Sequence, residues 1–131
     1  MSQTNLNRRV TKARYAVNAA VLQKVPGGFR VPSRTQVHHH IVLAHYQKRQ
    51  EGAGYRMTCH YEHGHGQYRC PGNQFGHICW HCLAALIKAV GKKQVAFFED
   101  LSEARRYQNL GGKMCMIWSG DGSGKLFAVV R

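Results

Sequence analysis

The spacing of hydrophobic and polar residues predicts short helices and strands in mixed order. From residue 7 to residue 22 the apolar residues recur at helical spacing, and most basic side chains lie off that stripe. Residues 21–25 and 29–31 are two short extended runs on either side of a Pro-Gly-Gly turn, and residues 32–36 are a second turn. A longer strand is expected over residues 37–46, with residues 37, 39, 41 and 43 on one face.

The second half of the chain continues this mixture. A loop over residues 48–54 leads into a strand at 55–59, and residues 83–90 predict a helix that ends at Gly91. Residues 94–98 predict a strand, and residues 102–110 a helix with Ser102 as its N-terminal cap. Residues 113–118 and 125–130 predict a closing hairpin across a glycine-rich turn.

These elements predict an α+β fold in one small domain of three parts. Residues 1–54 form an N-terminal helix and antiparallel strands, residues 55–91 a metal-binding element that leads into a helix, and residues 92–131 a β-α-β-β unit.

Charge points to a polyanionic partner. The 131 residues include 19 Lys and Arg against six Asp and Glu, a net charge of +13. An excess of this size repels itself unless a polyanion compensates it, which favours nucleic acid. Basic residues occur in most segments, so the charge is expected on a folded surface. With no long apolar run and no apolar N-terminal segment, we expect no membrane association and a cytoplasmic or nucleoid-associated protein.

Four of the five cysteines fall between residues 59 and 82, mixed with histidines. In a reducing compartment such a group favours a metal over disulfides. Structural zinc takes four ligands, usually as two pairs from separate segments. Cys59 and Cys70 offer one half of a site, and Cys79 offers another at the start of a helix. The spacing leaves the fourth ligand open among His60, His77, His81 and Cys82.

The stretch from residue 29 to residue 86 resembles the SWIM zinc-finger family, whose signature is C-x-C, a variable gap, then C-x-H opening a helix. Cys79-Trp80-His81, followed by apolar residues 83–86, is similar to the second half, and the strands expected before it resemble those that precede the finger. The first half of the signature differs in this chain, because residues 60–69 form an insertion in the C-x-C element. This resemblance implies four zinc ligands: Cys59, Cys70, Cys79 and His81. Its alternatives are Cys82 for His81, and His60 or His63 for Cys70.

SWIM modules generally bind nucleic acid or proteins, often in mobile-element and chromatin-associated proteins. Resemblance and charge together predict a DNA-binding protein, with DNA preferred over RNA and phosphate contacts dominant, in a mobile-element or phage nucleoprotein complex. The alternative is a zinc-stabilised adaptor of a larger assembly. The expected nucleic-acid contacts are Arg8, Arg9, Lys12, Arg56, Arg69, Lys88, Lys92 and Lys93.

Catalysis is not expected. His60-x-Glu62 with Cys79-x-x-Cys82 resembles the zinc site of nucleobase deaminases, which is a remote alternative. Gly64 and Gly66 disfavour the helix on which such an enzyme carries its His and Glu. Residues 120–125 lack the spacing of a phosphate-binding loop and predict a hairpin turn instead.

Cys115 stands apart from the other cysteines and is expected to be a small buried hydrophobe.

Overall fold

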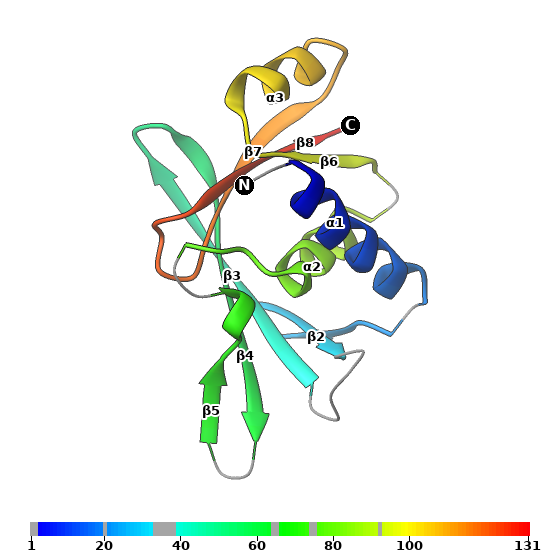
Figure 1. The fold of residues 1–131 in the computed structure, drawn as a ribbon, viewed down its shortest axis with the longest axis vertical. Helices are drawn as coiled ribbons and strands as arrows, with labels where there is room; N and C mark the ends of the chain where they lie inside the picture. Colours follow the sequence, from blue (N-terminus) through cyan, green and yellow to red (C-terminus); the bar gives the residue numbers. More distant parts are fainter. Residues whose placement is uncertain (1–2, 20, 33–38, 64–65, 74–75, 92) are drawn as a thin grey trace.

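The computed structural model describes residues 3–19, 21–32, 39–63, 66–73, 76–91 and 93–131. Across these residues the fold is mixed α+β, with three α-helices against one eight-stranded sheet (Figure 1). The helices are α1 (Gln3–Asn18), α2 (Trp80–Val90) and α3 (Leu101–Gln108), and a short 3-10 helix, η1, spans Pro71–Asn73. The α+β class and the single small domain are therefore confirmed.

The sheet runs in the order β1-β2-β3-β4-β7-β8-β6, and β5 pairs with the far end of β4. Within the described residues every pairing is antiparallel except that of β4 with β7. The strands are β1 (Gln23–Val25), β2 (Gly28–Pro32), β3 (His39–Arg49), β4 (Gly52–His63), β5 (Gly66–Arg69), β6 (Val95–Phe98), β7 (Lys113–Trp118) and β8 (Lys125–Val130).

Several elements differ from their predicted bounds. The first helix lies four residues earlier than predicted, and α2 begins at Trp80, before the expected residue 83. The residues taken as an insertion extend β4 and form β5, and this hairpin projects from the body of the molecule (Figure 1). The N-terminal cap of α3 is Asp100, not Ser102, because the Asp100 carboxylate accepts the Glu103 amide at 3.1 Å. Most of the turn predicted at 32–36 lies outside the described residues.

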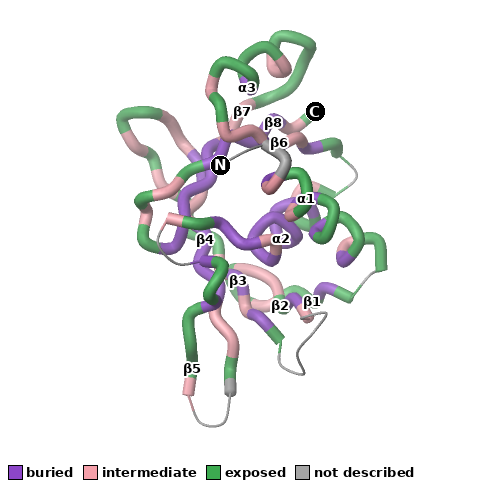
Figure 2. The backbone as a smooth tube through the Cα atoms, viewed as in Figure 1, coloured by how far each residue is buried: buried purple, intermediate pink, exposed green. Residues whose placement is uncertain are grey.

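Two apolar clusters lie on opposite faces of the sheet. Helices α1 and α2 cover one face, and α3 covers the other face over β6, β7 and β8 (Figures 1 and 2). On β3 the buried residues are His40 and Val42, which lie on the side of α1 and α2. Ile41 and Leu43, on the face that the sequence marks as apolar, are only half-buried. The tertiary pairing thus buries the opposite face of this strand.

The two parts of the sheet meet where Gly54 of β4 pairs with Met116 of β7. A Cβ at Gly54 would lie 1.9 Å from the Met116 carbonyl oxygen, a backbone atom that cannot move alone. We expect Gly54→Ala to lower the free energy of unfolding by about 3 kcal/mol, measured by chemical denaturation. The control is Gly91→Ala, which has open space around it but a φ of 70°, and should cost about 1 kcal/mol. Equal losses in the two variants would contradict the steric argument.

Candidate metal centre

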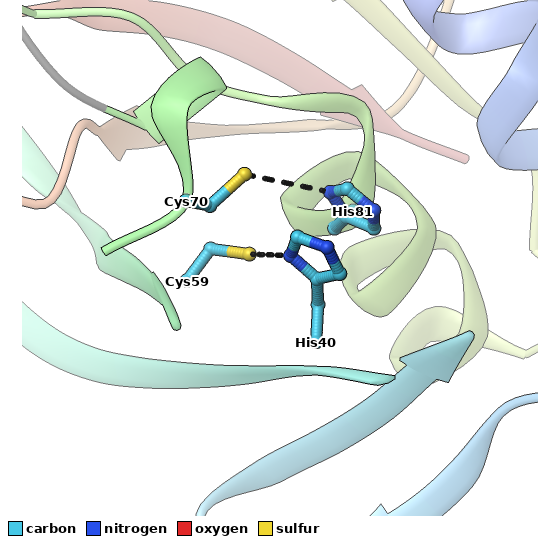
Figure 3. A group of neighbouring side chains, drawn as sticks. All are labelled: His40, Cys59, Cys70 and His81. Atoms are coloured by element: carbon cyan, nitrogen blue, oxygen red, sulfur yellow. Dashed lines mark hydrogen bonds between the residues drawn. The ribbon is translucent and has the colours of Figure 1, made fainter. Parts of the chain in front are cut away.

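Four buried donors from four different segments meet beside α2 (Figure 3). His40 comes from β3, Cys59 from β4, Cys70 from the residue after β5, and His81 from the first turn of α2. Their ligand atoms all lie within 4.8 Å of one another. The Cys59 sulfur is 3.5 Å from His40 Nδ1, and the Cys70 sulfur is 3.9 Å from His81 Nδ1. This cluster can hold a metal ion.

Two further cysteines adjoin these four donors. Cys79 is the N-terminal cap residue of α2, and its sulfur lies 3.6 Å from that of Cys82. Side-chain hydrogen bonds to Cys70, Cys79 and Cys82 raise the pKa of the Cys59 thiol far above its usual value. The hydrogen bond from Cys59 lowers the pKa of Cys70 to about 7 and that of Cys82 to about 5. The four sulfurs are therefore close enough to form hydrogen bonds with one another.

Asn73 holds the segments of the cluster together. Its side chain is fully buried, accepts the Cys59 amide at 3.1 Å and donates to the Met57 carbonyl at 3.2 Å. It also donates to the Cys82 sulfur at 3.6 Å. One amide thus links β4 to α2 from the 3-10 helix between them. Because the N-terminus of α2 carries a positive partial charge, it favours the thiolate form of nearby cysteines.

The two histidines cannot both coordinate one ion as they are placed. Their rings stack with centroids 3.8 Å apart and planes 10° from parallel. An imidazole lone pair lies in the plane of its ring, so two stacked rings do not direct their lone pairs at one point. His81 Nε2 is also buried without a hydrogen bond to any described residue. At most one of these histidines is therefore a ligand in this arrangement.

Three of the four ligands predicted from the sequence, Cys59, Cys70 and His81, lie in this cluster, and Cys79 adjoins it. The sequence did not reveal His40. The alternation of β3 could have indicated it, because Val42, two residues along the same face, pairs with Cys59. Two of the alternative ligands are not in the cluster. His60, which pairs with Arg69, follows Cys59 on β4 and so lies on the opposite face of that strand, and His77 is exposed. The side chain of His63 lies outside the described part of the chain.

The residues predicted to contact nucleic acid divide into two groups. Arg9 donates to the Ile78 carbonyl and lies 3.7 Å from Glu99, and Arg56 donates to the Gly120 carbonyl at 3.0 Å. These two guanidinium groups therefore stabilise the fold. Lys92 lies outside the described residues. The exposed members are Arg8, Lys12, Arg69, Lys88 and Lys93.

Fold and site together define a small, strongly basic α+β protein with a buried cysteine and histidine cluster that can hold a metal ion. No family model, curated protein or solved structure matches the chain. Among the described helices, none has the length and apolar character needed to cross a membrane.

Proposed function

We propose that this protein is a zinc-stabilised module that binds nucleic acid, with DNA preferred over RNA. The buried cluster supports the metal part of this proposal. Thiolate and imidazole donors favour zinc over the hard cations magnesium and calcium, which prefer oxygen ligands. Sites that supply four protein ligands and are closed to solvent are typical of structural zinc.

In this proposal the ligands are the four sulfurs of Cys59, Cys70, Cys79 and Cys82. The stacked rings exclude the set with both histidines, and the 3.6 Å separation of the Cys79 and Cys82 sulfurs suits two ligands of one ion. His40 and His81 then donate Nδ1–H to the sulfurs of Cys59 and Cys70. Such outer donors stabilise the negative charge of a zinc-tetrathiolate centre and orient its ligands.

Substitution and X-ray absorption test this ligand set. Four sulfurs give a single shell near 2.3 Å, whereas a histidine ligand adds a nitrogen near 2.0 Å. We expect His81→Ala to lower the affinity for zinc on the order of 10–100-fold. Cys82→Ala should lower it more, because this change removes a ligand. Cys115→Ser, outside the cluster, should leave affinity unchanged. A nitrogen shell, or the reverse ranking of the two variants, would restore His81 as the fourth ligand.

An uneven charge distribution supports the nucleic-acid part of the proposal. Helices α1 and α2 and strands β1, β2, β3 and β5 contain no acidic residue. Among the described residues the one ion pair joins Arg9 to Glu99, so the other exposed basic side chains of α1 and α2 have no carboxylate bound to them, which favours phosphate binding. Apart from Arg14, which donates to the Val95 carbonyl, these residues on α1, α2 and the segments after them are Arg8, Lys12, Lys24, Lys88 and Lys93. The acidic residues are Glu51, Glu62, Glu99, Asp100, Glu103 and Asp121.

Titration of the nuclease-treated, zinc-loaded protein with labelled oligonucleotides tests this function. Duplex DNA, single-stranded DNA and RNA of equal length are compared at low salt. We expect dissociation constants at or below about 1 µM, because nonspecific binding strengthens steeply as salt is lowered. If none of the three binds in this range and the protein captures a protein partner instead, the adaptor function replaces this proposal.

A further inference from the structure

A groove lies between the second half of α2 and the sheet face formed by β2, β3 and β4. Its volume is about 680 Å³, within the range of pockets that take small molecules. Small residues on both walls leave this space unfilled: Ala85 and Ala89 on α2, Gly28 and Ala44 on the strands. We call this space the α2 groove.

The α2 groove combines flat apolar walls with positive charge. Phe29 and Tyr55 supply aromatic surface, and Lys24 and Lys88 also line it. Neither lysine forms a salt bridge with a described residue. Tyr46 extends the aromatic surface beyond the groove, because it is 64% exposed and meets Tyr55 edge-on at 5.6 Å. A ligand that fits these features has a flat ring and a negative charge.

We infer that the α2 groove takes one unpaired base of a single-stranded nucleic acid. The base stacks on Tyr55 and Tyr46, and the ammonium groups of Lys24 and Lys88 hold the adjoining phosphates. This inference rests on the proposed nucleic-acid binding and specifies its site. Base stacking on aromatic side chains combined with a basic groove is how proteins bind single strands without reading sequence. A base within a duplex enters such a groove only after it leaves its stack, which costs free energy.

Two variants test the groove without disturbing the core. Ala89 is exposed on α2, so Ala89→Phe fills the groove from its rim, and Tyr46→Ala removes an exposed ring. Each is expected to weaken binding of oligodeoxythymidylate about ten-fold and to leave duplex binding unchanged. Leu110→Ala is the control, because Leu110 is 78% exposed after α3, outside the groove and away from the surface of α1 and α2, and its loss should have no effect. Circular dichroism and zinc content confirm that each variant folds.

An abasic oligonucleotide of the same length separates base binding from phosphate binding. The wild-type protein should bind it about ten-fold more weakly than oligodeoxythymidylate. Equal affinities for the two probes, or wild-type affinity in Ala89→Phe, would overturn the groove assignment while DNA binding itself stands. If a fatty acid bound the wild type but not Ala89→Phe, and oligonucleotide binding were the same in both, the groove would belong to an anionic amphiphile. Failure of every oligonucleotide to bind the wild type would remove the proposed function and this inference together.

Discussion

Removal of the metal with a chelator is expected to unfold the protein. Structural zinc contributes on the order of 10 kcal/mol to folds of this kind, comparable with the whole stability of a small domain, about 5–15 kcal/mol. The proposed ligands come from β4, the residue after β5 and the start of α2, so the ion would fix the helix to the sheet. Without the ion, the buried thiols keep only their mutual hydrogen bonds as a link across the cluster.

Cys59→Ser should have a comparable effect, because Cys59 is fully buried and contacts the other three sulfurs. We expect loss of stoichiometric zinc and of the cooperative thermal transition, measured by elemental analysis and circular dichroism. Cys115→Ser is the control: Cys115 is half-buried on β7, outside the cluster, and its change should cost less than about 1 kcal/mol. A zinc-free protein that melts cooperatively at the wild-type temperature would contradict the structural role of the metal.

DNA affinity is expected to fall steeply with salt. Each phosphate neutralised by a lysine or arginine releases condensed counterions, and about five contacts give a slope near −4 for log affinity against log salt on duplex DNA. Between 50 and 200 mM salt the affinity should then fall by roughly two to three orders of magnitude. Fluorescence anisotropy at several salt concentrations measures this slope. An affinity that hardly varies with salt would favour the adaptor function.

The double variant Arg8→Ala/Lys12→Ala locates these contacts. Both residues are exposed on α1, one turn apart, and their loss should flatten the slope by up to about two. Arg105→Ala/Arg106→Ala is the matched control, because it removes the same charge from α3 on the opposite face of the sheet. That variant should keep the wild-type slope. Equal changes in both variants would mean that total charge, rather than the surface of α1 and α2, governs binding.

Local sequence patterns determined much of the fold. The hairpin of β7 and β8 lies at its predicted bounds, because its strands alternate and a glycine-rich turn separates them. The helical spacing of residues 83–90 and the glycine that follows indicated α2 and its end. The dense group of cysteines between residues 59 and 82 likewise pointed to the region of the cluster that can hold a metal ion. The SWIM resemblance and the preference for DNA stay predictions.

Only the tertiary structure decided how distant segments meet. The parallel pairing of β4 with β7 joins the two parts of the sheet, and nothing in either strand specifies that partner. The register of β3 against β4 brings His40 to Cys59, and the buried side chain of Asn73 links β4 with α2. The packing of α1 likewise places Arg9 against the Ile78 backbone carbonyl, although its charge suggested a phosphate contact. Sequence periodicity records which face of an element is apolar, whereas contacts across the fold depend on the register between elements, which no single segment encodes.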